Sequence, residues 1–548
     1  MLDKTFITII SFFSLFVLTV IPAQACTSLI VTKGASSDSS VMITYTCDGE
    51  FHPHLEYTPA ADYPSGDSLE ITDWHGNLRG RVAQVEHTYA VVGLMNEHQL
   101  AIGETTFGGR EDLHNPDGLL NYWDLMQLAL ERAKTAREAI EVMTELVKDY
   151  GYRSTGESFS IADPEEAWIM EMIGPGEGGR GAHWVALKVP DGYISCHANK
   201  ARIDEFPRND PENCIYSEDV IQFAINKGYY NPSSGKKFSF RDAYCPATTR
   251  NRRWADGRVW SIFRRAAPSL NLSPDYFRGV TDSEPYPLWI KPEEKISLED
   301  VFNLMRDHFE GTDFDMTKGI DAGPYGLPYR WRPLDWTIDS VKFYAWERPI
   351  STQQTAFSFV SQSRSWLPDP IGGVYWYGLD DTWFTCYTPL YCGIDEIPGS
   401  YTIGNLREFD WESAWWAFNF VSNFTALKYS FMMPDVQAVQ QSIEGKLLKL
   451  QPAVENTALE LYDDSSDLMI DYLTDYSIAH AELAVARWRD LGEYLIAKYN
   501  DGYVKNEENR PTEKGYPESW LKRVINEKPK QFEIKEHEDE TVESELVD

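Results

Sequence analysis

Hydrophobic and polar positions alternate along the first half of the chain in short runs that are typical of β-strands. Residues 27–33 and 41–48 are apolar runs joined by Gly, Ser and Asp, which predicts a β-hairpin. Three later pairs of runs flank turn residues in the same way: 89–95 with 100–106, 158–162 with 167–172, and 184–189 with 193–198. Residues 119–149 have helical apolar spacing and predict two helices. Hairpins separated by a helical block favour antiparallel sheets covered by helices, so we expect an α+β fold.

The second half of the chain predicts more helix. A short helix is expected at 258–267, and Ser297 begins another that runs to about Phe309. Residues 313–336 are rich in Gly, Pro and aromatic residues and predict an ordered loop of the kind that lines binding clefts. Short strands follow between 355 and 387, and helical spacing returns from about 412 to 500.

These patterns divide the chain into four segments. We expect a leader at 1–25, a main domain at 26–410, a helical region at 411–525 and an acidic, disordered tail at 526–548. The 548 residues are 43% hydrophobic and 14% aromatic, which suffices for a soluble globular enzyme. The net charge of -35 argues against nucleic-acid binding, because phosphates require a basic surface.

The amino terminus resembles a cleaved export signal. Lys4 precedes an apolar run from Phe6 to Ile21, and Ala-Gln-Ala then gives the small-residue pattern of a cleavage site after Ala25. The run is shorter than the roughly 20 residues that span a bilayer. We therefore expect a periplasmic or secreted protein, without stable membrane insertion, whose mature chain begins at Cys26. Lipidation of Cys26 is the alternative, although Ala23 stands where lipoproteins carry a leucine-like residue.

A terminal cysteine carries a thiol nucleophile and an amine base on one residue. The amine titrates near 7.7 to 8.0 in simple compounds, so it can accept the thiol proton near neutral pH. If Lys33 pairs with Val41 in the first hairpin, Cys26 lies opposite Asp48, whose carboxylate would stabilise the ammonium. A simple turn role for Asp48 is the alternative.

Two further stretches could contribute to a site. Asn199 follows a strand and could donate its amide N–H to an oxyanion, although it could also be a turn residue. The adjacent Cys196 and His197 point to opposite faces of a strand and cannot pair directly. Basic residues gather at 250–253 and at Arg258, Arg264 and Arg265. They form either a solvated helix face or a site in which an arginine lowers the thiol pKa or binds a substrate carboxylate.

Other chemistries have less support. His52 and His54 lie near Asp48 and could ligate zinc, but the chain has no His-Glu-x-x-His motif. Serine hydrolysis lacks a Gly-x-Ser-x-Gly elbow. Six of the seven cysteines remain if Cys26 is the nucleophile, and they could form disulfides or stay as buried thiols. We expect neither a metal nor a cofactor.

Five segments resemble the dipeptidase A family of cysteine peptidases. They are CTSLIVTKGAS from Cys26, NEHQLAIGETT from Asn96, HANKARI from His197, SQSRSWLP from Ser361 and IGGVYWYGLDD from Ile371. Members of that family are N-terminal-nucleophile hydrolases, distantly similar to choloylglycine hydrolases and penicillin V acylases. The similarity runs from Cys26 to about residue 420.

The resemblance implies a four-layer αββα fold for residues 26–410 and hydrolysis of dipeptides through an acyl-cysteine. By position, Cys26 is similar to the nucleophile, Asp48 to the partner of its amine and Arg258 to the distal active-site arginine. Asn199 is similar to an oxyanion donor, and Thr106 falls where relatives place a residue on the oxyanion and substrate side. Small peptides are the implied substrates, and a homo-oligomer is compatible with the sequence.

One position departs from the related acylases. They carry an arginine three residues before the aspartate, where this chain has Tyr45. Arg258 or the amine must then favour the thiolate. Two alternatives stay open: hydrolysis of a non-peptide amide, as in bile-salt or penicillin V acylases, and a lipidated surface binding protein with a decayed site.

Overall fold

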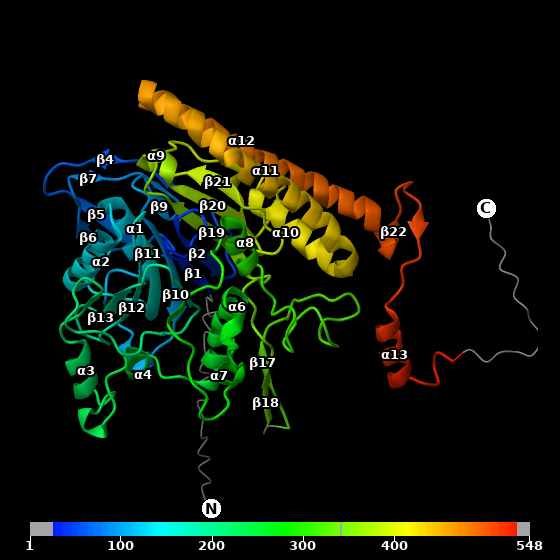
Figure 1. The fold of residues 1–548 in the computed structure, drawn as a ribbon, viewed down its shortest axis with the longest axis horizontal. Helices are drawn as coiled ribbons and strands as arrows, with labels where there is room; N and C mark the ends of the chain where they lie inside the picture. Colours follow the sequence, from blue (N-terminus) through cyan, green and yellow to red (C-terminus); the bar gives the residue numbers. More distant parts are fainter. Residues whose placement is uncertain (1–25, 340–341, 534–548) are drawn as a thin grey trace, which may run out of the picture.

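Two antiparallel β-sheets form the centre of the molecule (Figure 1). The computed structural model describes residues 26–339 and 342–533. One sheet has seven strands in the order β16-β14-β1-β2-β19-β20-β21, and the other has eight in the order β15-β13-β12-β11-β10-β9-β8-β3. The expected α+β class is confirmed.

The strands have these bounds. The seven-stranded sheet contains β1 (Ser28–Val31), β2 (Val41–Asp48), β14 (Ile194–His197), β16 (Trp289–Ile290), β19 (Thr355–Ser363), β20 (Val374–Leu379) and β21 (Thr388–Tyr391). The eight-stranded sheet contains β3 (Tyr57–Thr58), β8 (Val91–Val92), β9 (Met95–Asn96), β10 (Ala101–Phe107), β11 (Gly156–Ala162), β12 (Ala167–Ile173), β13 (His183–Lys188) and β15 (Cys214–Tyr216). Separate two-stranded ribbons are β4 (Ala61–Asp62) with β7 (His87–Thr88), β5 (Ser68–Thr72) with β6 (Leu78–Ala83), β17 (Asp335–Ile338) with β18 (Lys342–Ala345), and β22 (Val504–Lys505) with β23 (Pro511–Thr512).

The two sheets pack against each other through β1, β2, β10 and β11. All residues of β1, β2 and β11 are buried. A Cβ on Gly103 would lie 3.1 Å from the Cβ of Tyr45, so the close approach of β10 to β2 depends on glycine. His197 bridges the sheets, with its ring nitrogens 2.7 Å from the Thr105 hydroxyl and 2.8 Å from the Ser160 hydroxyl. The interface is thus polar near the start of β1.

Helices cover the outer faces of both sheets. On the eight-stranded sheet lie α1 (Tyr122–Arg132) and α2 (Ala136–Tyr150), the two helices expected from 119–149. Asn121 and Thr135 cap their amino termini. Against the seven-stranded sheet lie α8 (Leu298–Met305), α10 (Ala414–Thr425), α11 (Tyr429–Asp464) and α12 (Ser466–Tyr499). The remaining helices are α3 (Val220–Asn226), α4 (Phe240–Tyr244), α5 (Thr249–Asn251), α6 (Gly257–Ala266), α7 (Asp275–Arg278), α9 (Asp369–Gly372) and α13 (Glu518–Glu527).

Buried ion pairs hold α11 in place. Arg306, directly after α8, lies 2.5 Å from the Glu444 carboxylate of α11, and both side chains are 7% exposed. Glu444 also accepts a hydrogen bond from the backbone N–H of Tyr387, and Arg364 after β19 pairs with Glu455 of α11 at 2.5 Å. The long helix is therefore bound to the body by charge as well as by apolar contact.

Two details of the expected secondary structure are wrong. The runs 184–189 and 193–198 do not form a hairpin, because β13 pairs with β12 and β15, whereas β14 pairs with β1 and β16. The turn at Gly192 carries the chain from one sheet to the other. The helix that begins after Ser297 ends at Met305 instead of Phe309.

Some expectations fall outside the described residues. The leader at 1–25 does, and so does the predicted tail from residue 534 onward. The division of the chain into four segments stays a prediction. Within the described ranges, no helix combines the length and the apolar character needed to cross a membrane. All seven cysteines are buried free thiols.

Candidate active site

Cys26 is the first described residue and lies fully buried just before β1. Its backbone nitrogen donates a hydrogen bond to Oδ1 of Asn199 at 2.9 Å. The expected pairing of Lys33 with Val41 is wrong by one residue, because Val31 pairs with Met42 and Thr27 with Thr46. Continuing this register places Cys26 level with Cys47.

The turn between β1 and β2 accounts for the shift. The Asp38 carboxylate accepts hydrogen bonds from the Ser36 and Ser40 hydroxyls, both at 2.6 Å, and from the Ser40 backbone N–H. Ser39 has a φ of 66° in the left-handed region. This compact local structure, which strand periodicity alone does not reveal, sets the register one residue away from the expected one.

Asp48 ends β2 and is buried beside the same site. Its carboxylate accepts a hydrogen bond from Arg348 at 2.6 Å and one from the Thr355 hydroxyl at 2.7 Å. Burial raises the pKa of Asp48 to about 6, although the Arg348 guanidinium acts to lower it. The structure therefore brings Asp48 into the environment of Cys26 but pairs it with an arginine.

Asn199 links three parts of the site. It has a φ of 61°, a conformation that asparagine tolerates better than most residues. Its amide oxygen accepts hydrogen bonds from the Cys26 N–H and from Nη2 of Arg258, both at 2.9 Å. Its amide nitrogen donates to the Thr106 carbonyl oxygen at 2.7 Å. The contact with Cys26 thus runs through the amide oxygen, and the oxyanion role of Asn199 stays a prediction.

Arg258 lies on α6, which continues from a π-helical turn over Arg252–Asp256. Its Nη1 donates to the carbonyl oxygen of Cys26 at 2.6 Å and to the Thr27 hydroxyl at 2.8 Å. Nη2 also donates to the Ala198 carbonyl at 3.1 Å. Arg258 therefore holds the backbone on both sides of the site.

A carboxylate and a hydroxyl contact the Cys26 sulfur. Its Sγ lies 3.6 Å from Oε1 of Glu104 and 3.9 Å from the hydroxyl of Tyr45, which donates to the same Glu104 oxygen at 2.6 Å. Burial raises the pKa of the Cys26 thiol well above its ordinary value. The Cys47 thiol and the charges of Glu104 and Asp48 raise it further. The thiol needs another source of activation in this environment.

A second carboxyl lies behind Glu104. Burial raises the pKa of Glu157 well above its ordinary value, and the charge of Glu104 adds to that rise. The two glutamates are on neighbouring strands, β11 and β10, which pair directly. The charge of Glu104 therefore opposes ionisation of Glu157.

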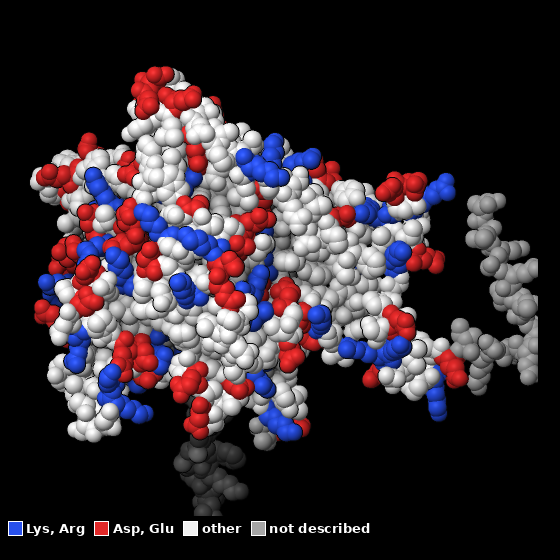
Figure 2. Space-filling view, viewed as in Figure 1, with Lys and Arg blue, Asp and Glu red and all other residues white. Residues whose placement is uncertain are grey.

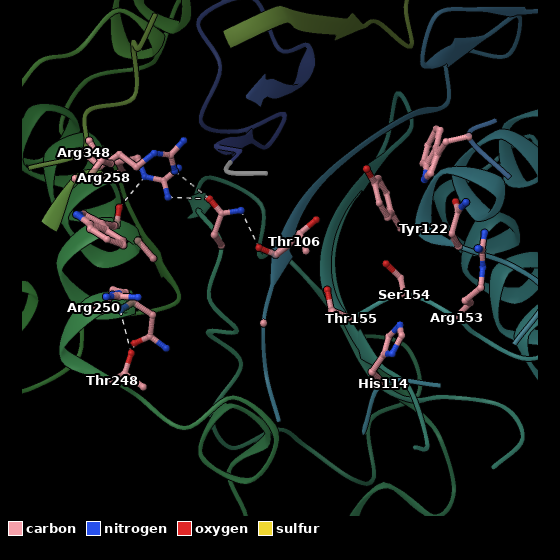
Figure 3. Close-up of a pocket in the computed structure, with 18 of the residues that line it drawn as sticks. Thr106, His114, Tyr122, Arg153, Ser154, Thr155, Thr248, Arg250, Arg258 and Arg348 are labelled. Carbon is pink, nitrogen blue, oxygen red and sulfur yellow. Dashed lines mark hydrogen bonds between the residues drawn. The ribbon is translucent and has the colours of Figure 1, made fainter. Parts of the chain in front are cut away.

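A cleft of about 840 Å³ opens next to these residues. Thr106, Asn199, Arg258 and Arg348 line it, so it reaches the Cys26 network. Figure 3 shows Arg258, Arg348 and Arg250 on one side, Tyr122 and Arg153 on the other, and Thr106 between them. The loop expected at 313–336 contributes Arg332 and Leu334, in agreement with its predicted place beside a cleft.

The structure separates the basic residues from one another. Arg250 and Arg258 line the cleft, whereas Arg253 pairs with Glu347, and Arg264 and Arg265 lie near Asp307 at 3.5 and 3.3 Å. Sequence reasoning missed Arg348, which lies in a loop without a motif. It also missed Glu104, whose signal was available: a carboxylate inside the apolar strand 100–106 needs a partner.

The two histidines considered as zinc ligands have other partners. His52 lies 3.0 Å from the Ser413 hydroxyl and His54 lies 3.0 Å from the Gly404 carbonyl. Among the residues that the structure describes, no cluster of His, Cys, Asp and Glu is arranged to hold a metal ion.

Comparison with known proteins gives one family. The model of the family described as "Peptidase family C69" matches residues 25–442. A "Probable dipeptidase" of Latilactobacillus sakei is 25% identical over 462 residues, which cover 80% of this chain and 89% of that protein. A "Probable dipeptidase" of Salmonella dublin is 26% identical over 392 residues, covering 68% and 81%. A "Dipeptidase" of Bifidobacterium longum is 24% identical over 431 residues, covering 72% and 76%. The chain therefore belongs to peptidase family C69, the cysteine-peptidase family that its motifs resemble.

Proposed function

We propose that this protein is an exported dipeptidase that cleaves dipeptides through an acyl-cysteine on Cys26. Membership of family C69 and the names of the relatives support a cysteine-type dipeptidase. The observation that carries the assignment to Cys26 is the 2.9 Å hydrogen bond from its nitrogen to Asn199. That contact would hold a free amine beside its own thiol after cleavage at Ala25.

We also propose the four-layer αββα arrangement of N-terminal-nucleophile hydrolases. Its support is the face-to-face packing of the two sheets, with α1 and α2 on one outer face and α11 and α12 on the other.

The proposed reaction begins with proton transfer from the thiol to the α-amine. Before cleavage the thiol has a raised pKa and lies next to Glu104, so it is a poor nucleophile. Cleavage would create an amine at the nitrogen that Asn199 already holds, and Asp48 would stabilise its ammonium form. Sγ then attacks the carbonyl carbon, and the resulting oxyanion takes an N–H from the Asn199 amide, whose other N–H is donated to Thr106.

Collapse of the tetrahedral intermediate breaks the C–N bond. The ammonium of Cys26 gives its proton to the leaving amine, and the acyl group stays on sulfur. Water, activated by the amine, then attacks the thioester and releases the amino-terminal residue of the dipeptide. Each step uses the same amine as acid or base, so a blocked amine stops the whole cycle.

The test is the intact mass of the protein purified from cells that express the full chain. We expect a chain that starts at Cys26 and hydrolyses dipeptides. Cys26→Ala should lose turnover by several orders of magnitude while its melting temperature stays near that of the wild type. Cys214→Ala, which removes a thiol on the edge strand β15, is the matched control and should keep activity. Residues retained before Cys26, or a lipid on its sulfur, would overturn the proposal.

A further inference from the structure

The lining of the cleft beside Cys26 is basic, whereas the protein as a whole is acidic. The chain carries 85 Asp and Glu against 50 Lys and Arg. Among the described residues that line the cleft, no Asp or Glu occurs and six are arginines: Arg79, Arg153, Arg250, Arg258, Arg332 and Arg348. A cleft with one sign of charge concentrates ligands of the other sign. The walls therefore favour an anionic ligand.

Several of these arginines already have partners inside the protein. Arg258 holds the Cys26 carbonyl, and Arg348 holds the Asp48 carboxylate. Arg250 forms an ion pair with Asp335 at 2.5 Å. These three residues mainly build the site, so a ligand anion must be bound elsewhere in the cleft.

Arg153 differs from them. It lies between α2 and β11, on the wall opposite Arg258 and Arg348 (Figure 3). Its Nε and Nη2 make no hydrogen bond to residues 26–339 or 342–533, and both are shielded from solvent, so a ligand in the cleft reaches them only when the side chain turns toward it. These two nitrogens form the edge of a guanidinium that binds a carboxylate with two parallel N–H donors. Arg153 therefore has the donors for a bidentate anion contact and no described acceptor for them.

The neighbours of Arg153 strengthen the case. The guanidinium of Arg79 is close enough to act on Arg153, and it is a like charge. Asp124 and Asp73 offset part of that repulsion. Neither carboxylate hydrogen-bonds Arg153, because Asp124 caps α1 through the Asn121 N–H and Asp73 accepts from its own turn at Asn77. A carboxylate from a ligand would satisfy Arg153 and separate the two like charges.

We propose that Arg153 binds a carboxylate of the substrate and so determines specificity for dipeptides that carry this carboxylate. The specificity in hydrolysis rests on the proposed dipeptidase function, whereas the binding of a carboxylate by Arg153 does not. The cleft volume of about 840 Å³ accommodates a dipeptide. A substrate laid across it would present its peptide bond on the Cys26 side and its carboxylate to Arg153. The carboxylate is either the free carboxyl terminus or the side chain of Asp or Glu.

The experiment compares the wild type with Arg153→Gln, Arg153→Lys and Arg81→Gln. Arg81 is on β6, the strand of Arg79, pairs with Glu70 and does not line the cleft, so its variant removes one charge without touching the proposed site. Substrates are Ala-Ala, its amide Ala-Ala-NH2, Ala-Glu and Ala-Gln. We expect Arg153→Gln to raise KM at least tenfold for one carboxylate class, with kcat within about threefold. Arg153→Lys should reverse only part of this rise in KM, because lysine lacks the two-donor edge of a guanidinium.

The set of substrates whose KM rises in Arg153→Gln identifies the carboxylate that Arg153 binds. Loss on Ala-Ala without loss on Ala-Ala-NH2 assigns Arg153 to the carboxyl terminus. Loss on Ala-Glu without loss on Ala-Gln assigns it to the acidic side chain. If Arg153→Gln changes KM for every substrate by no more than Arg81→Gln does, the inference is overturned.

A binding measurement separates this inference from the proposed function. Calorimetric titration of Cys26→Ala with Ala-Glu needs no turnover. The double variant that carries Cys26→Ala and Arg153→Gln should bind Ala-Glu at least tenfold more weakly than Cys26→Ala alone. Ala-Gln or the amide, which each lack one carboxylate, are the control ligands. This result supports carboxylate binding even if the wild type hydrolyses no dipeptide. Absence of any dipeptide binding to Cys26→Ala, or equal binding with and without Arg153, contradicts it.

Discussion

At the scale of single residues, the site places acids where thiol chemistry needs a cation. Tyr45 occupies the position at which the related acylases carry an arginine, and its hydroxyl donates to Glu104 instead of stabilising a thiolate. Arg258 contacts the backbone of Cys26, and Arg348 contacts Asp48. The free amine is therefore the group that we expect to activate the sulfur.

Asp48 should make the activity depend on pH. Its pKa is raised to about 6, and the ionised form is the one that pairs with Arg348 and would stabilise the ammonium. We expect kcat/KM to rise with pH through about 6. Asp48→Asn should remove this limb and lower kcat/KM by roughly 100-fold. pH–rate profiles from 4.5 to 9 measure both effects, with Asp62→Asn, an exposed carboxylate on β4, as the control.

The same group affects stability in a fixed direction. The unfolded chain releases the Asp48 proton near pH 4, whereas the folded protein keeps it to about pH 6. The folded state therefore binds more protons in this window, and the Asp48 contribution to stability falls as pH rises from 4 to 6. Asp48→Asn should flatten that part of the curve of unfolding free energy against pH. A curve unchanged by the substitution would contradict the raised pKa.

At the scale of elements, local patterns were enough for the helices over 119–149 and for most hairpins. The helical spacing of 119–149 predicted α1 and α2 because each helix buries one apolar stripe. The turn at Gly192 misled the prediction because pairing there depends on distant residues. The Thr32 hydroxyl accepts hydrogen bonds from the backbone N–H groups of Gly192 and Tyr193, which draws β14 to β1 rather than to β13.

Some residues of the site could be predicted from the sequence, whereas others are brought together only by the fold. The structure places Cys26, Asn199 and Arg258 in mutual contact, and all three were candidates from the sequence. Arg348 was not, because it lies far from Asp48 in the chain and only the fold joins them. The pairing of Glu104 with Tyr45 is likewise a contact between the two sheets, which strand periodicity does not describe.

The buried pair of Arg306 and Glu444 predicts how firmly α11 is attached. Glu444→Ala should lower the unfolding free energy by about 3 to 5 kcal/mol, because it leaves Arg306 charged and buried without its partner. Chemical denaturation measures the change. Glu518→Ala on α13 breaks an exposed pair with Lys522 and should cost less than about 1 kcal/mol. Equal losses in the two variants would show that burial does not decide the effect.

At the scale of the whole molecule, charge is distributed unevenly. Figure 2 shows acidic and basic side chains intermixed over the sheet-containing body and a largely uncharged surface over α10. The net charge is -35, yet the cleft walls are basic. Anionic substrates must therefore pass a repulsive exterior before they reach an attractive interior.

This arrangement predicts a salt effect that depends on substrate charge. Raising ionic strength from 10 mM to 1 M shortens the screening length from about 30 Å to about 3 Å. We expect KM for Ala-Glu to rise several-fold relative to KM for Ala-Gln, with kcat unaffected for both. Steady-state kinetics at five salt concentrations would give the ratio. If the ratio of KM for Ala-Glu to KM for Ala-Gln falls with salt, the acidic exterior governs substrate entry, and if the ratio is constant, the charge of the cleft does not affect KM.

Under the proposed export, the single amide of Asn199 also has a consequence for when the chain becomes active. It ties the start of β1, the strand β10 of the other sheet and the helix α6 to one another. None of these contacts exists until both sheets and the helix have docked. A chain threaded unfolded through a translocation channel would therefore be inert toward cellular peptides, and peptidase activity would report that folding on the far side is complete.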